Sequence, residues 1–173
     1  MDDWPDIPTA LTKAESIALE MLAIDNRVLE VGALLGYSTV VMARVACQVV
    51  SVDPHQGYPE RDPKPTLDEY LNNLERYGVI EKVVPVIGTI EKAGEFLDPE
   101  MFSLVFLDLT GRYEDTFQAM MNINCLHGGG VLAVHDCGHP EWPGVQQAVQ
   151  EFSKLEKIEP MIVDRLAIFS SND

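Results

Sequence analysis

The segment from Val28 to Thr39 constrains the fold most strongly, because it reads Val-Leu-Glu-Val-Gly-Ala-Leu-Leu-Gly-Tyr-Ser-Thr. Its apolar start predicts a buried strand over 27–31, its glycines a tight turn, and its end the start of a helix over 37–47. Glycine lets the backbone approach a bound ligand where a Cβ would collide. A dinucleotide fingerprint needs G-x-G-x-x-G, whereas Glu30 to Gly36 has the spacing E-x-G-x-x-x-G. This difference argues against a nicotinamide-dependent oxidoreductase.

The same segment resembles the first motif of class I S-adenosylmethionine-dependent methyltransferases, and is especially similar to the catechol O-methyltransferase branch. The resemblance implies that Gly32 and Gly36 shape the turn under the methionine part of the cofactor. Glu30 would support that turn, and Tyr37 and Ser38 would open the helix beside the cofactor. An ordinary strand-turn-helix with a tight glycine corner is the structural alternative.

The resemblance places further cofactor contacts after later strands. Asp53 ends a predicted strand over 49–53 and would accept hydrogen bonds from the two ribose hydroxyls, since an ionised carboxylate only accepts. The family places residues against the adenine at the positions that correspond to Gly88, Thr89 and Ile90 of this sequence. Asp108 closes the next strand at the same edge, where ligands of open α/β sheets bind.

Composition limits the partners that the chain can have. The 173 residues are expected to form one domain over 1–173, and 46% of them are hydrophobic. The 28 acidic and 12 basic residues give a net charge of −16. Binding to nucleic acid depends on clustered Lys and Arg, so the charge argues against nucleic acid and against an anionic membrane surface.

The cysteines and the beginning of the sequence bear on the compartment. Cys47, Cys125 and Cys137 are odd in number and widely spaced, which favours reduced thiols over disulfides or a zinc site. The start Met-Asp-Asp-Trp-Pro lacks the features of a signal peptide, and no apolar run approaches the ~18 residues of a membrane helix. We therefore expect a cytoplasmic protein.

Predicted strands alternate with predicted helices along the chain. A capping box at Thr12 to Glu15 begins a helix that runs to Ile24. Further helices are expected over 66–77, 89–97, 114–126 and 144–152, and further strands over 83–86, 102–108, 131–134, 158–163 and 166–169. Nearly all-apolar strands indicate a parallel sheet covered on both faces.

The last two strands are joined by a short turn near 164–165, so they must be antiparallel. The pattern therefore predicts an α/β, doubly wound, Rossmann-like and mostly parallel sheet that ends in an antiparallel hairpin. This arrangement is similar to the seven-stranded fold of class I methyltransferases.

Asp108 and Asp136 are candidate metal ligands. In catechol-type and related antibiotic-tailoring O-methyltransferases, acids at these two strand ends hold a divalent cation that favours deprotonation of the acceptor. Oxygen ligands favour Mg²⁺. His135 is a poor Mg²⁺ ligand, however, and Cys137 stands where catechol-type enzymes usually carry Asn. Alternatively, Asp136 caps a turn and His135 fills a polar niche.

The expected general base is missing from the segment 106–114. Relatives read roughly F-I-D-G-D-H-S-Y-E there, and their histidine is replaced by Gly111, which also stands at the offset of the catechol-type lysine. His135 and His139 are the candidate replacements, with His55 as a weaker third, because histidine titrates near neutral pH. Alternatively, no protein base is needed if a metal at Asp108 supplies the oxyanion of the acceptor, or if the acceptor is already acidic.

The acceptor is expected to contact the loop over 58–65, the region of Trp4 and the loop over 139–143. Trp142 and Tyr58 have aromatic faces that suit a planar substrate, but they would equally suit covering the sheet edge or contacting a partner subunit. The chain lacks an inserted acceptor domain, which indicates a small-molecule acceptor or a lid supplied by a homo-oligomer. We expect a methyltransferase acting on a hydroxyl; the alternative is a cofactor-binding module without catalysis.

Overall fold

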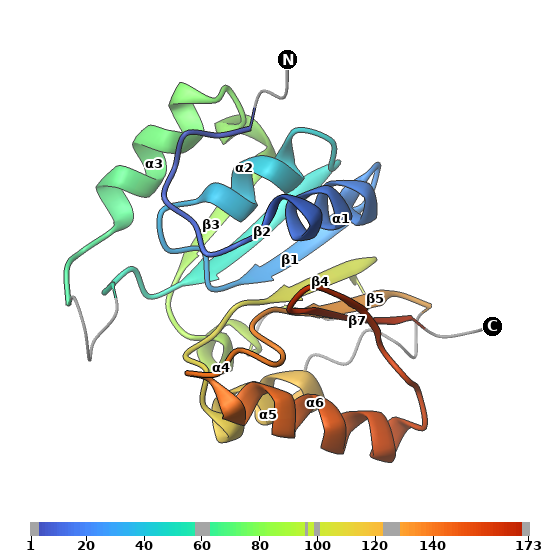
Figure 1. The fold of residues 1–173 in the computed structure, drawn as a ribbon. Coiled ribbons are helices and arrows are strands. Elements are labelled where there is room, and N and C mark those ends of the chain that lie inside the picture. Colours follow the sequence, from blue (N-terminus) through green and yellow to red (C-terminus); the bar gives the residue numbers. More distant parts are fainter. Residues whose placement is uncertain (1–3, 58–62, 96, 99–100, 123–128, 171–173) are drawn as a thin grey trace.

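The computed structural model describes residues 4–57, 63–95, 97–98, 101–122 and 129–170, and it contains one sheet between two layers of helices (Figure 1). The strands are β1 (Arg27–Val31), β2 (Gln48–Asp53), β3 (Val83–Ile87), β4 (Leu104–Leu107), β5 (Val131–Val134), β6 (Met161–Val163) and β7 (Leu166–Ser170). The α-helices are α1 (Lys13–Ala23), α2 (Tyr37–Ala43), α3 (Leu67–Arg76), α4 (Ile90–Ala93), α5 (Tyr113–Asn122) and α6 (Pro143–Glu156), and a 3₁₀ turn covers Ile80–Lys82.

The sheet has the order β3-β2-β1-β4-β5-β7-β6. Its first five strands pair in parallel, whereas β7 pairs antiparallel with both β5 and β6. The predicted mixed sheet with an antiparallel C-terminal hairpin is therefore confirmed. Since β1 and β4 are central and buried on both faces, their apolar runs match the expectation for parallel strands.

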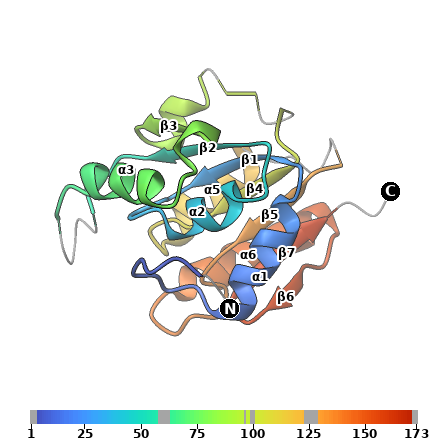
Figure 2. The ribbon, with the colours of Figure 1, turned by 90° about the horizontal axis from the view of Figure 1, so that it is seen from above.

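Two apolar layers hold the helices on opposite faces of the sheet. Helices α1, α2 and α3 pack on one face, and α4, α5 and α6 pack on the other (Figures 1 and 2). Along β1, Leu29 and Val31 belong to the layer under α5 and α6, while Val28 belongs to the opposite layer. Glu30 shares the face of Val28 because side chains alternate along a strand.

Several helices differ in length from the prediction. Helix α2 ends at Ala43 instead of Cys47, because the chain turns there and the Cys47 N–H donates to the Asn26 carbonyl beside β1. Helix α6 continues to Glu156 and ends where Lys157 takes a left-handed conformation. The predicted end of α5 at Leu126 lies outside the described residues.

The parallel strands bring their carboxyl ends to one edge of the sheet. The residues at or just beyond this edge include Gly32, Asp53, Asp108 and Asp136. Among the described residues, no helix has the length and apolar character needed to cross a bilayer.

Candidate active site

The turn after β1 depends on glycine for a reason that lies in the neighbouring strand. Gly32 has a φ of 92°, and a Cβ there would lie 1.8 Å from the backbone oxygen of Asp108. The Gly32 N–H donates to the Val52 carbonyl, so the turn is fixed between β2 and β4. Leu34 also has a positive φ, of 48°, which is uncommon for a residue with a side chain. The backbone just after β4 therefore requires glycine at position 32, in addition to the predicted approach of a ligand.

Asp53 holds this turn through its carboxylate. Oδ2 accepts from the N–H groups of Ala33 at 2.7 Å and Leu34 at 2.9 Å, and Oδ1 accepts from the N–H of His55 at 2.6 Å. A carboxylate offers about four lone-pair sites, so these bonds leave about one for a ligand. Asp53 therefore lies at the predicted position of the ribose-binding acid, but backbone N–H groups already occupy most of its hydrogen-bond acceptor sites.

Glu30 lies beneath the turn, fully buried, and accepts from three hydroxyl groups. Oε1 accepts from Ser38 at 2.5 Å, and Oε2 accepts from Thr39 at 2.5 Å and Ser51 at 2.8 Å. Burial raises the pKa of Glu30 to about 7, although the three hydroxyl donors oppose that change. The side chain supports the start of α2 from below and has no exposed surface.

The other predicted cofactor residues occupy the same edge. Ser38 points to Glu30, and the Tyr37 hydroxyl lies 3.2 Å from the Ser16 hydroxyl on α1. After β3, the Gly88 N–H donates to the Asp53 carbonyl. Thr89 is exposed at the start of α4, whereas Ile90 packs partly against the core under α5 and α6. The predicted adenine segment thus lies beside Asp53.

His135 lies at the centre of a cluster of carboxylates at the ends of β4 and β5. Its Nδ1 lies 3.4 Å from Oδ1 of Asp108 and 3.6 Å from Oδ1 of Asp136, and its Nε2 lies 3.4 Å from Oε2 of Glu15. The His135 side chain is fully buried, and neither ring nitrogen makes a hydrogen bond of normal geometry. Nδ1 and one oxygen from each of Asp108 and Asp136 lie within 4.8 Å of one another, as donors around one cation would.

The charges in this cluster depend on one another. Burial by itself lowers the pKa of His135, but the carboxylates of Asp108 and Glu15 outweigh it and raise that pKa to about 10. Burial also raises the pKa of Asp136. Without a cation, His135 is therefore an imidazolium at neutral pH, a state that cannot accept a proton from a substrate.

Glu15 belongs to this cluster, although the sequence indicated only its capping role. Its Oε2 accepts from the Thr12 N–H at 2.7 Å, which completes the predicted capping box. Its Oε1 accepts from the Arg165 N–H at 2.7 Å, in the turn between β6 and β7. Burial raises the pKa of Glu15, but His135 and these backbone donors outweigh it and lower that pKa to about 2. No sequence spacing indicates the approach to His135, because it depends on tertiary packing.

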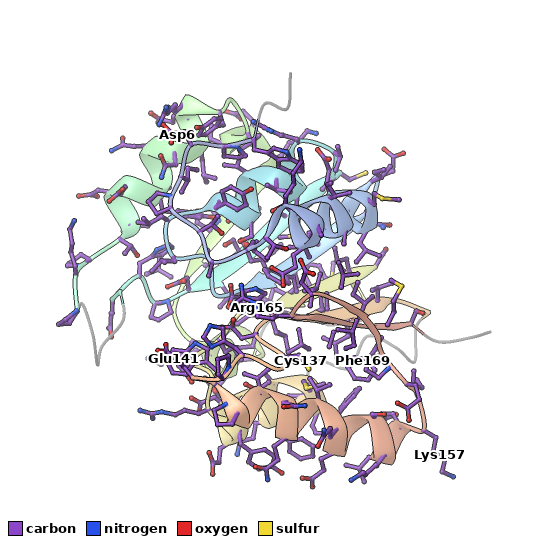
Figure 3. All side chains as sticks on the ribbon, in the orientation of Figure 1. Asp6, Cys137, Glu141, Lys157, Arg165 and Phe169 are labelled. Carbon is purple, nitrogen blue, oxygen red and sulfur yellow. The ribbon has the colours of Figure 1, made fainter. Side chains whose placement is uncertain are left out.

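The other two candidate bases lie apart from His135. His139 is partly exposed, and its Nδ1 accepts from the Glu141 N–H at 3.2 Å. His55 is buried, with its Nδ1 3.0 Å from the Thr66 hydroxyl, and burial lowers its pKa. Arg165, Cys137 and Glu141 are labelled in Figure 3 and belong to the loops around the cluster. Among the candidate bases, exposure favours His139.

Gly111, which replaces the expected base, is covered by an aromatic ring. A Cβ at Gly111 would lie 2.5 Å from Cε3 of Trp142, and Gly111 has a φ of 78°. Trp142 also packs partly against the core under α5 and α6. This position agrees with the expectation that Trp142 covers the sheet edge. Tyr58, the other predicted aromatic contact, lies outside the described residues.

Comparisons with known proteins bear on the fold and the family of the chain. Three solved structures share the fold: cofactor-bound Rv0187 from MTB, the O-methyltransferase TomG from Streptomyces achromogenes in complex with SAM, and the SAH-bound methyltransferase PaMTH1 from Podospora anserina. Their identities are 22%, 18% and 20%, and their TM-scores are 0.73, 0.67 and 0.68. The alignments cover 96%, 94% and 94% of this chain and 84%, 82% and 80% of theirs.

A family model described as a methyltransferase domain matches residues 29–137, from within β1 to just beyond β5. No curated protein matches the chain. The match covers more than half of the sequence and includes the glycine turn, Asp53, Asp108, His135 and Asp136. The resemblance to class I S-adenosylmethionine-dependent methyltransferases is confirmed, and the chain belongs to this methyltransferase-domain family.

Proposed function

We propose that the protein transfers the methyl group of S-adenosylmethionine to a hydroxyl of a small molecule. The observation that carries this proposal is the position of the Asp53-bound glycine turn beside the Asp108–His135–Asp136 cluster, at one edge of the sheet. An O-methyltransferase in complex with SAM is among the proteins that share the fold.

The cofactor would lie on the turn between β1 and α2. Gly32, Gly36, Tyr37 and Ser38 would contact its methionine part with Glu30 beneath, and Gly88, Thr89 and Ile90 would contact its adenine. Asp53 has acceptor capacity for about one ribose hydroxyl while it holds the turn. When bound, S-adenosylmethionine supplies an electrophilic methyl group, and the turn orients it toward the acceptor.

A divalent cation would be held by Asp108 and Asp136. Their oxygens and the His135 nitrogen converge, and both carboxylates retain exposed surface, 33% of the Asp108 side chain and 15% of that of Asp136. The cation would supply Lewis acidity toward the acceptor hydroxyl. With or without a cation, Asp108 would lie close to the acceptor.

The proton of the acceptor would leave through His139 or without any protein base. His139 is the partly exposed candidate, whereas His135 is buried and the carboxylates around it raise its pKa to about 10. The variant His139→Gln is expected to lower the rate at neutral pH if His139 accepts this proton. An unchanged rate would favour an acceptor whose oxyanion forms without a protein base.

The alternative function is cofactor binding without catalysis, and Trp142 is the observation that favours it. The Trp142 ring fills the space that a side chain at position 111 would need. A base at this position, where relatives carry one, would have to displace the ring. Transfer to any phenol or sugar in an acceptor screen would exclude this alternative.

The first experiment is calorimetric titration with S-adenosylhomocysteine, once with Mg²⁺ and once with EDTA. Micromolar binding would support the cofactor assignment, and a difference between the two conditions would support a cation at Asp108 and Asp136. Absence of binding in both conditions would overturn the proposal. Labelled S-adenosylmethionine offered with a panel of phenols and sugars then tests transfer.

The proposed partners follow from charge and size. A net charge of −16 disfavours nucleic acid and anionic membranes, so the acceptor is proposed to be a small molecule. Cys47 and Cys137 are free thiols, and reduced thiols are typical of the proposed cytoplasmic location. A homo-oligomer that supplies a lid remains a prediction, which light scattering on the purified protein can test.

A further inference from the structure

We propose that Nδ1 of His135 is a third protein ligand beside Asp108 and Asp136, and that Glu15 fixes the ring for this role. The site would therefore prefer a divalent transition metal to Mg²⁺. This inference rests on the proposed cation site, but neither S-adenosylmethionine nor methyl transfer enters its argument.

The first support is the state of the His135 ring. Its side chain is fully buried, yet neither nitrogen makes a hydrogen bond of normal geometry. Buried polar atoms almost always have a partner, and one without a partner calls for an explanation such as an ion. Nδ1 faces the two aspartates, so a cation between them would give this nitrogen its partner.

The distances agree with shared coordination. Nδ1 lies 3.4 Å from the Asp108 oxygen and 3.6 Å from the Asp136 oxygen. Ligands about 2.1 Å from one tetrahedral ion lie about 3.4 Å apart. The ligand atoms of the two aspartates and His135 all lie within 4.8 Å of one another, so a cation could bind between them once the carboxylates close around it.

The position of Glu15 determines which nitrogen of the His135 ring carries the proton. Backbone N–H groups of Thr12 and Arg165 hold its two oxygens, so its position does not depend on His135. Its Oε2 lies 3.4 Å from Nε2, so when a cation takes the place of the Nδ1 proton, the remaining proton stays on Nε2. Metal-ligating histidines generally direct their other N–H toward a carboxylate, which fixes the tautomer and the orientation of the ring. Glu15 is therefore a positioning residue.

Other charges near the cluster do not take the place of the cation. Arg165 is the nearby cation among the described residues, and its guanidinium nitrogens approach Asp136 and Glu15 only to 3.9 Å. Its Nη2 donates instead to the Ala10 carbonyl at 2.7 Å. The space between Asp108, His135 and Asp136 is thus not bridged by this side chain.

The donor set determines the metal. Mg²⁺ demands hard oxygen ligands and retains its waters, whereas imidazole suits Zn²⁺, Fe²⁺ and related transition metals. One nitrogen and two carboxylate oxygens should therefore bind Mn²⁺, Co²⁺ or Zn²⁺ more tightly than Mg²⁺. An all-oxygen site at Asp108 and Asp136 would show a smaller preference and no coupling to a nitrogen ligand.

The test is metal binding by the full chain after removal of bound metal. Calorimetry with Mn²⁺, Co²⁺, Zn²⁺ and Mg²⁺ should show at least about tenfold tighter binding of Co²⁺ than of Mg²⁺. Pulsed electron paramagnetic resonance of the Mn²⁺-loaded protein should show coupling to a nitrogen nucleus. Equal affinity for Mg²⁺ and Co²⁺, or no nitrogen coupling, would overturn the inference without any variant being needed.

Two variants then separate the roles of the residues. His135→Gln should abolish the nitrogen coupling and the preference over Mg²⁺. Glu15→Gln should weaken Co²⁺ binding by about 10- to 100-fold and retain the coupling at saturating metal. Glu20→Gln, on the same helix and outside the cluster, is the matched control and should bind metal as the wild type does. Unchanged Co²⁺ affinity in a folded Glu15→Gln would contradict the role of Glu15.

The failure of this inference can be distinguished from failure of the proposed function. S-adenosylhomocysteine binding in EDTA tests the cofactor site without any metal. If that binding is observed and transition metals are not preferred, only the inference about His135 and Glu15 fails. If metal preference is observed without cofactor binding, the proposed function fails and the metal site stands.

Discussion

The indole ring of Trp142 lies against Gly111, in the space that a side chain at position 111 would need. Gly111 also has a φ of 78°, a backbone conformation that residues with a side chain rarely adopt. The two residues therefore depend on each other, since the ring can take this position only where no Cβ stands.

Gly111→Ala is expected to lower the free energy of unfolding by about 2–4 kcal/mol, from overpacking against the ring together with backbone strain. Gly78→Ala is the control, because Gly78 has a φ of 68° with nothing within 4 Å of its Cβ position. It should lose only about 1–2 kcal/mol. Urea unfolding measures both, and equal losses would show that the Trp142 contact has no energetic effect.

Gly32 should be the least replaceable glycine of the turn. Its Cβ would meet the Asp108 carbonyl of the backbone, which cannot rotate away as a side chain can. Gly32→Ala is therefore expected to lower the unfolding midpoint more than Gly78→Ala and to abolish S-adenosylhomocysteine binding. Circular dichroism during heating provides the measurement. A Gly32→Ala protein as stable as the wild type would contradict the close approach of the ends of β1 and β4.

The fold could be predicted from the sequence because its signals are local. Nearly continuous apolar runs such as Leu104–Leu107 indicate strands buried on both faces, and the capping box at Thr12 marks a helix start. The short turn before Leu166 required an antiparallel pair. These patterns depend on neighbours in the chain, which the sequence displays directly.

The environment of the site residues could not be predicted, because it depends on contacts between distant segments. Ser51 reaches Glu30 only because the two residues are paired in register across β1 and β2. Glu15 reaches His135 only through the packing of α1 beside the C-terminal hairpin. Residue types and spacing predicted which strand ends carry acids but not what each acid contacts.

Glu30 is expected to make stability depend on pH. Its pKa in the folded protein is about 7, above the ordinary value of 4.5, so the folded state holds this proton more tightly than the unfolded chain does. Stability from this group is fully present below pH 4.5 and is lost as the pH rises through 7. The loss is on the order of 3 kcal/mol at most.

Glu30→Gln removes this titration. As the pH rises from 4.5 to above 7, the wild type should therefore lose unfolding free energy relative to the variant. Urea unfolding at several pH values measures it. Glu69→Gln on the exposed face of α3 is the control and should parallel the wild type. Parallel profiles for Glu30→Gln as well would mean that the three hydroxyl donors keep Glu30 ionised.

Asp53→Asn tests whether the acid at the end of β2 acts on the turn, on the cofactor or on both. An amide has only one acceptor oxygen, so the variant cannot satisfy Ala33, Leu34 and His55 together as the carboxylate does. We expect a loss of about 1–3 kcal/mol in unfolding free energy, since a buried N–H is left without a partner.

We also expect S-adenosylhomocysteine to bind Asp53→Asn at least about tenfold more weakly, because a charge-assisted bond to ribose is lost together with the shape of the turn. Asp68→Asn, an exposed acid on α3, should change neither quantity. If affinity for adenosine falls as much as that for S-adenosylhomocysteine, the loss lies at the ribose. If only S-adenosylhomocysteine is affected, Asp53 acts through the turn under the methionine part, and its three backbone bonds are its whole contribution.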